Sequence, residues 1–219
     1  MKKTIIIITT IITSMVNIGK AQETADIDDR GKLAFGLKAG ANRSNVYDAS
    51  GQNFIANSKM GFAGGAFFSI PIGKYLGIQP EALLSQKGYK ATGILLDSPY
   101  SDTRTTTYLD IPLQLQFKPL EILTILGGVQ YSYLLHQRDV YTFGANSTAQ
   151  DQAFQNDNVR KNIFGAVLGV DLNINHFVIS TKACWDLQNN AGNGSSSTPR
   201  YKNVWLQATI GFRLYSNHN

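Results

Sequence analysis

Strict alternation of apolar and polar positions marks residues 108–118. The odd positions are all large and apolar and the even positions mostly polar, so that Leu109, Ile111, Leu113, Leu115 and Phe117 alternate with Tyr108, Asp110, Pro112, Gln114, Gln116 and Lys118. Because successive side chains of a strand point to opposite faces, this segment predicts a strand with one apolar and one polar face. The apolar face must contact either a protein core or lipid.

The same period of two recurs in seven further segments, in which large apolar residues alternate with small or polar ones. These predicted strands cover residues 33–40, 60–70, 75–87, 122–135, 164–173, 176–187 and 204–214. The segment 122–135 has the least regular phase, and its outward face is expected to carry Leu123, Ile125, Val129, Tyr131 and Tyr133. With residues 108–118, the chain has eight predicted strands.

Long and short connections alternate between these strands. The long connections, predicted as external loops, cover 43–58, 88–106, 136–159 and 188–200, and the short ones lie near 71–74, 118–121 and 173–175. Bacterial outer-membrane barrels have an even number of strands, short periplasmic turns and long external loops. Soluble sandwiches and lipocalin-like barrels have no reason to alternate so strictly. The pattern predicts an all-β, eight-stranded antiparallel up-and-down transmembrane β-barrel whose apolar face contacts lipid.

The N-terminus has the features of a secretory signal peptide: a basic start, an apolar run and small residues before Gln22. The alternative is a single anchoring helix, but the run is shorter than the roughly 20 residues that a membrane span needs. We predict a cleaved signal peptide at 1–21, a short periplasmic leader at 22–31, and a barrel domain at 32–216 that is located in the outer membrane.

Charge and cysteine content argue against a nucleic-acid-binding protein and against a disulfide-stabilised scaffold. Cleavage would remove three lysines and no acid, which lowers the formal net charge from +5 to +2. No clustered basic face appears, so nucleic acid is not an expected partner. The single cysteine, Cys184, cannot form an intramolecular disulfide, and inside a strand it is most simply a small filler.

If the apolar faces contact lipid, the polar faces collect charged side chains inside the barrel. An eight-stranded barrel is just filled by its side chains, and an unpaired buried charge is unfavourable, so these groups should form a network of ion pairs. The predicted lumen network consists of Lys38, Glu81, Asp110, Asp171, Lys182 and Arg213. Structural filling is the expected role, and a conduction or binding path is the alternative.

Candidate catalytic and metal-binding groups are few. Ser132 and His136 lie four residues apart and would share a face near the external end of their strand, with Asp139 in the following loop, an arrangement that could support acyl hydrolysis. A polar strand end explains them equally. The three histidines lie far apart in the sequence, so neither a metal site nor a cofactor is expected. Aromatic residues near the predicted strand ends fit interfacial girdles: Tyr75, Tyr108, Tyr131, Tyr133, Trp185 and Tyr215.

With the strands placed, the chain resembles the PorT-like outer-membrane β-barrel family of Bacteroidetes-type bacteria. Four stretches carry the resemblance: residues 33–40 (LAFGLKAG), 77–88 (GIQPEALLSQKG), 108–113 (YLDIPL) and 209–214 (TIGFRL). The resemblance implies a small barrel of the OmpA/OmpX shape in the outer membrane and implies no catalytic residues.

Four hypotheses about function follow. The first is a non-enzymatic outer-membrane barrel that contacts outer-membrane lipid and binds solutes or other envelope proteins through its four external loops. The second is a component of a protein-secretion or gliding apparatus of the PorT type. The third is a narrow porin, and the fourth is a lipid-modifying or proteolytic barrel that uses Ser132 and His136.

Overall fold

The computed structural model describes residues 28–50, 55–95, 98–143, 146–152, 159–191 and 200–215. This part contains a short 3-10 helix, η1 (Asp29–Gly31), and nine strands: β1 (Ala34–Ser50), β2 (Ile55–Pro71), β3 (Leu76–Leu95), β4 (Ser98–Phe117), β5 (Leu123–Phe143), β6 (Asn146–Gln152), β7 (Asn162–Ile174), β8 (Phe177–Asp186) and β9 (Arg200–Tyr215). The predicted signal peptide and residues 22–27 of the predicted leader lie outside the described residues.

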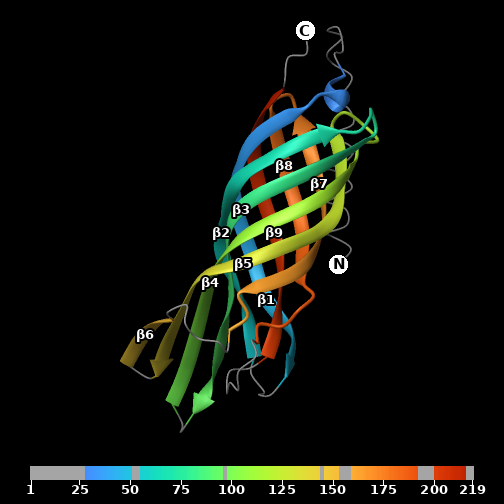
Figure 1. Cartoon of the computed structure of the whole chain (residues 1–219). Helices are drawn as coiled ribbons and strands as arrows, with labels where there is room; N and C mark the ends of the chain where they lie inside the picture. Colours follow the sequence, from blue (N-terminus) through green and yellow to red (C-terminus); the bar gives the residue numbers. More distant parts are fainter. Residues whose placement is uncertain are drawn as a thin grey trace, which may run out of the picture.

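Eight of the strands close into the predicted barrel (Figure 1). The sheet order is β4-β3-β2-β1-β9-β8-β7-β5-β6, every pairing is antiparallel, and the additional pairing of β4 with β5 closes the eight strands other than β6 into a ring. The ninth strand, β6, pairs with β5 alone, from Gln137 opposite Gln152 to Phe143 opposite Asn146. The sequence of β6 (NSTAQDQ) has no apolar face, so its alternation could not be read from hydrophobicity and the predicted count of eight omitted it.

Three neighbouring strands continue well past the barrel. β3, β4 and β5 are 20, 20 and 21 residues long, whereas β8 has 10 residues. Their extensions (residues 88–95, 98–105 and 137–143), together with β6, form what we call the projecting sheet (Figure 1). We call this end of the barrel the extended end. The opposite end, which carries the short turns at 72–75, 118–122 and 175–176, is the turn end.

The projecting sheet corrects the prediction of long loops at 88–106 and 136–159, and β1 and β2 also run into the predicted loop at 43–58. The apolar-polar alternation ends where the outer face no longer meets lipid. Strand propensity persists there, because β4 carries Thr103 and Thr105 in its extension and Thr106 and Thr107 directly after it, and β-branched residues favour extended backbone.

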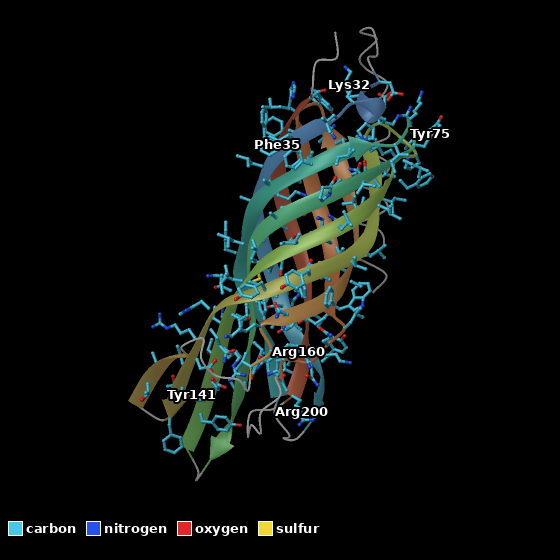
Figure 2. All side chains as sticks on the ribbon, in the orientation of Figure 1. Lys32, Phe35, Tyr75, Tyr141, Arg160 and Arg200 are labelled. Carbon is cyan, nitrogen blue, oxygen red and sulfur yellow. The ribbon has the colours of Figure 1, made fainter. Side chains whose placement is uncertain are left out.

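The outer wall of the barrel is apolar, as predicted. Leu115 is 66% exposed and Ile210 is 63% exposed, and large apolar side chains face outward on all eight barrel strands. A continuous apolar surface of this extent is foreign to soluble monomers and typical of contact with lipid. Tyr75 and Tyr133 are exposed at opposite ends of the wall (Figure 2 labels Tyr75), but Tyr108 is buried in the lumen, which contradicts its assignment to an aromatic girdle. Within the described ranges, we find no helix with the length and apolar character of a membrane span.

One irregularity in β5 changes which residues face the lumen. The register with β4 shifts between Thr107 and Tyr108, where Leu135 is an extra residue on β5. Before this bulge the even positions of β5 are buried, as in Ser132 and Leu134, whereas after it Gln137 and Asp139 are buried. The outward phase predicted for Leu123 to Tyr133 agrees with the exposure of these residues.

Candidate functional site

The lumen holds polar side chains in layers, each built from the inward-facing positions of several strands. Of the six residues of the predicted lumen network, five are almost completely buried and one, Arg213, lies partly buried at the turn end: Lys38, Glu81, Asp110, Asp171 and Lys182 are each no more than 4% exposed. The structure does not bring all six together. It divides them among a central layer, a second layer toward the extended end, and the turn end.

Glu81 organises the central layer. Its Oε1 atom accepts hydrogen bonds from Lys38 Nζ at 2.8 Å and Lys182 Nζ at 2.6 Å, and both contacts are ion pairs between fully buried groups. Gln79 Nε2 also donates to this oxygen, at 2.7 Å, and lies 3.4 Å from Asp171 Oδ2. Two lysines therefore face two carboxylates, and the central layer is electrically balanced.

A second layer contains Asp110 and a lysine that the predicted network did not include. Lys87 Nζ donates to Asp110 Oδ1 at 2.9 Å and to Ser132 Oγ at 3.3 Å. The same ammonium group lies 3.7 Å from the centre of the Trp205 ring and 4.6 Å from that of Tyr108. Cation–π contacts of this kind are favourable when the cation is desolvated.

A third layer, at the base of the projecting sheet, lies mostly in segments that the sequence predicts as loops. Arg104 donates to both carboxylate oxygens of Asp139, at 2.8 and 2.9 Å, and to the hydroxyl of Tyr201 at 3.3 Å. Gln137 also donates to Asp139, and Tyr89 packs edge-on against Tyr201. Arg104 continues the even-numbered phase of Tyr108 and Asp110, a signal that could have identified it, whereas the bulge at Leu135 hid Asp139.

The candidate catalytic pair is not assembled. Ser132 faces the lumen, where it accepts hydrogen bonds from Lys87 and Gln130, whereas His136 is exposed on the outer face. The extra residue in β5 places these two side chains on opposite faces, and this corrects the expectation that they share one. Within the described part of the chain, no group of three His, Cys, Asp or Glu side chains could hold a metal ion.

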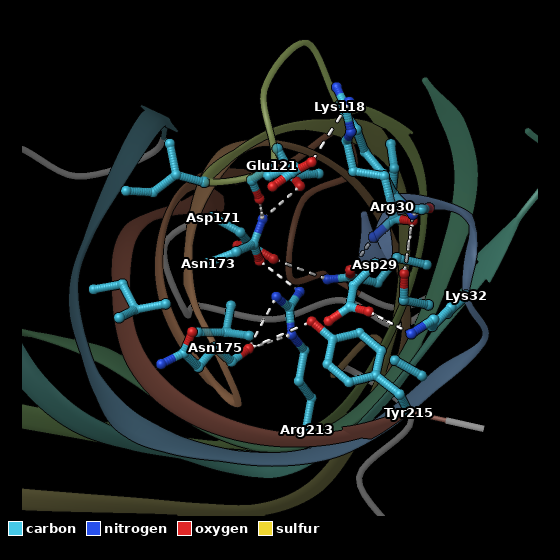
Figure 3. A pocket seen from close by; sticks show the side chains of 18 of the residues that line it. Asp29, Arg30, Lys32, Lys118, Glu121, Asp171, Asn173, Asn175, Arg213 and Tyr215 are labelled. Atoms are coloured by element: carbon cyan, nitrogen blue, oxygen red, sulfur yellow. Dashed lines mark hydrogen bonds and ion pairs between the residues drawn. The ribbon is translucent and has the colours of Figure 1, made fainter. Parts of the chain in front are cut away.

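The turn end contains a cavity of about 310 Å³ between η1, the short turns and the ends of several strands (Figure 3). Its charged lining residues are Asp29, Arg30, Lys32, Lys118, Glu121, Asp171 and Arg213. The helix η1 is held at this mouth by Arg30, which donates to both oxygens of Asp28 and to the carbonyl oxygen of Pro119. The hydrogen bonds of Arg30 hold the pKa of Asp28 well below its usual range.

A family model described as outer membrane protein beta-barrel domain matches residues 20–192 of the chain. The chain belongs to this outer-membrane β-barrel family. Membership indicates an outer-membrane location. Bacterial outer-membrane barrels in general carry their short turns on the periplasmic side.

Several solved outer-membrane barrels are similar in fold at low sequence identity. Ail, the attachment invasion locus protein of Yersinia pestis, is 12% identical with a TM-score of 0.48, covering 84% of this chain and 99% of Ail. OprG from Pseudomonas aeruginosa is 14% identical with a TM-score of 0.44, covering 87% of this chain and 100% of OprG. Neisserial surface protein A is 14% identical with a TM-score of 0.44, covering 82% and 97% of the two chains. No curated protein sequence gives a significant match.

Proposed function

We propose that this outer-membrane barrel is a non-enzymatic binding protein that presents its projecting sheet to a macromolecule outside the cell. The observation that carries the proposal is the extension of β3, β4 and β5 beyond the apolar wall. Exposed Tyr141 and Phe143 near the tip of β5 lie on the face that continues from buried Gln137 and Asp139, opposite to the face of His136 and Arg138. Aromatic side chains exposed to water above the lipid are typical of protein-binding surfaces.

The projecting sheet is supported as a folded element. Tyr89 and Tyr201 pack with Ala91 in a small buried cluster, against which Val46 and Ala56 also pack. The Arg104–Asp139 ion pair lies next to this cluster. A surface held by its own core loses less conformational entropy on binding than a flexible loop does, which favours a binding role.

Photo-crosslinking in intact cells tests this proposal. A benzoylphenylalanine at Tyr141 would sit on the projecting sheet (Figure 2), and the same residue at Leu168, 56% exposed on the lipid-facing wall, is the matched control. We expect adducts with a surface macromolecule from position 141 and lipid adducts alone from position 168. Identical adducts at both positions would refute the proposed role of the projecting sheet.

A role in a PorT-type secretion or gliding apparatus is the second proposal. The two most specific stretches of the resemblance contribute Glu81, Lys87 and Asp110, which all make lumen ion pairs. The resemblance therefore supports a shared barrel construction more directly than a shared partner. Co-purification from gently solubilised membranes distinguishes the two, because an apparatus component should be recovered in a stable complex with other envelope proteins.

The layered ion pairs favour a closed lumen over a narrow porin. Planar-bilayer recordings on the refolded chain test this point. We expect no steady conductance, and a large steady conductance would show that the layers leave an open path.

A further inference from the structure

The turn-end cavity contains two cations that differ from every other charged group around it. Lys118 and Arg213 lie on opposite sides of the cavity (Figure 3). Lys118 follows β4 directly and is only 5% exposed, and Arg213 lies near the end of β9. Neither makes an ion pair with a carboxylate of the described residues.

The neighbouring charges are already compensated. Arg30 is paired with Asp28 at 2.8 Å, and Lys32 is paired with Asp29 at 2.7 Å. Glu121 is a rim residue whose side chain is 42% exposed and lies 3.9 Å from Arg30. The remaining acid of the lining, Asp171, belongs to the central layer described above. Asp29 and Asp171 attract Arg213 electrostatically, but neither forms an ion pair with it within 4 Å among the described residues.

Among the described residues, Lys118 and Arg213 make hydrogen bonds to neutral oxygens only. Lys118 Nζ donates to the carbonyl oxygen of Arg30 at 2.9 Å and approaches Ser69 Oγ at 3.5 Å. Arg213 donates to Asn173 Oδ1 at 2.8 Å and, from two nitrogens, to the carbonyl oxygen of Asn175. A guanidinium group has five N–H donors and an ammonium group has three, so both side chains keep donors for a further acceptor.

The two cations also affect each other. Burial, together with the positive charge of Arg213, lowers the pKa of Lys118 to about 8, and the charge of Asp28 opposes this shift only weakly. An anion between the two side chains would reverse the sign of this interaction, because each cation would then face a negative charge.

We propose that the turn-end cavity binds a small multivalent oxyanion, with a phosphate or similarly charged group held between Lys118 and Arg213. Arginine matches the geometry of phosphate oxygens through its planar fork, and lysine supplies a compact charge. The volume of about 310 Å³ is at the lower end of the range for small-molecule sites. A free phosphorylated solute of the periplasm and a lipid headgroup share this chemistry.

Isothermal titration calorimetry of the full chain, refolded in phosphate-free detergent micelles, tests the site with inorganic sulfate and inorganic phosphate at constant ionic strength. We expect one saturable site with a Kd of about 1 mM or tighter. Lys118→Gln and Arg213→Gln should each weaken binding about tenfold, since each removes a charged hydrogen-bond donor. The matched control is Lys74→Gln, which removes the same charge from the same end of the barrel outside the cavity lining and should change Kd by less than about twofold.

The pH dependence gives a second readout. Sulfate keeps its charge, so its binding should weaken between about pH 7 and about pH 9 as Lys118 loses its proton, and Lys118→Arg should bind sulfate with little change over this range. This comparison uses variants that retain the charge, so it decides the question even if Lys118→Gln does not refold. Repeating the phosphate titration in phosphatidylglycerol nanodiscs separates the sources: loss of binding identifies the lipid headgroup as occupant, and unchanged binding identifies a soluble anion. Absence of saturable binding of either ion, or equal weakening by Lys74→Gln and Lys118→Gln, would overturn the proposal.

Discussion

Replacement of Glu81 by glutamine should be among the most destabilising single changes in the barrel. One oxygen of this carboxylate accepts hydrogen bonds from both Lys38 and Lys182. Glutamine has nearly the same shape and keeps a hydrogen-bond acceptor, so the substitution removes the charge without opening a cavity. The two ammonium groups would then face each other across a neutral amide.

The magnitude follows from the geometry. Because both nitrogens contact the same oxygen, they lie no more than about 5.4 Å apart, and two like charges at that distance repel by roughly 3 kcal/mol at an effective dielectric constant of about 20. Removing one partner of a buried ion pair typically destabilises a protein by about 3–5 kcal/mol. Here one removal breaks two pairs, so we expect Glu81→Gln to lower the free energy of unfolding by about 4 kcal/mol or more.

Urea unfolding of the refolded barrel in lipid vesicles, followed by tryptophan fluorescence, measures this change. Asp171→Asn is the matched control, since it makes the same chemical change in the same layer without breaking an ion pair within 4 Å among the described residues, and should cost less than about 2 kcal/mol. Adding Lys182→Met to Glu81→Gln should recover about 2 kcal/mol, because it removes the repulsion. If Glu81→Gln changes the unfolding free energy by less than about 1 kcal/mol, the lysines are solvated and the central layer is not an ion-pair layer.

Three further outcomes follow from the structure. Asp28 has a depressed pKa in the folded chain, so its stabilisation of η1 should be complete above about pH 4 and should decline as the pH falls further, which the nitrogen chemical shift of Arg30 Nε would report. Arg104→Gln leaves the carboxylate of Asp139 buried without its cation, so hydrogen exchange in the projecting sheet should accelerate about tenfold while that of the barrel wall is unchanged. Gly88→Ala should destabilise the chain by more than about 2 kcal/mol in urea unfolding, because Gly88 has a φ of 144° and a Cβ there would lie 2.0 Å from the Arg104 carbonyl oxygen. The control is Gly73→Ala, which should shift the urea midpoint little because no atom lies within 4 Å of the added Cβ.

The sequence predicts the barrel wall well because lipid imposes a simple rule on it. Every outward position of a barrel strand must be apolar, and every second residue is outward, so a period of two reports both the strand and its face. Leu115 and Ile210 obey this rule, as do the inward positions of Lys38 and Asp171. Tyr108 also follows the rule, because its even position predicts an inward side chain; only its aromatic character suggests a membrane girdle.

The hydrophobic pattern does not identify the strands that extend beyond the lipid-facing wall. The strands of the projecting sheet lack the continuous apolar outer face of the barrel wall, and the backbone pairing that holds β6 to β5 leaves no compositional pattern. The extra residue at Leu135 also leaves no recognisable pattern in the sequence, although it reverses the phase of β5 and places Ser132 and His136 on opposite faces. The alternation of apolar and polar residues therefore predicts which face of a strand each side chain occupies, whereas bulges and water-facing strands can be located only from the pairing register of the structure.

Because the sequence does not give the register, it identifies charged residues of the lumen but does not show which of them pair with one another. Lys38, Lys118 and Lys182 all occupy inward positions of their segments, and by composition they are equivalent. The register places Lys38 and Lys182 around one carboxylate, whereas Lys118 faces neutral oxygens and a second cation across a cavity. A buried cation that the fold neutralises itself contributes to the structure, but a buried cation without a carboxylate is unfavourable until an anion arrives. In a barrel whose lumen is filled with charge, it is the uncompensated pair rather than the dense network that indicates where a ligand binds.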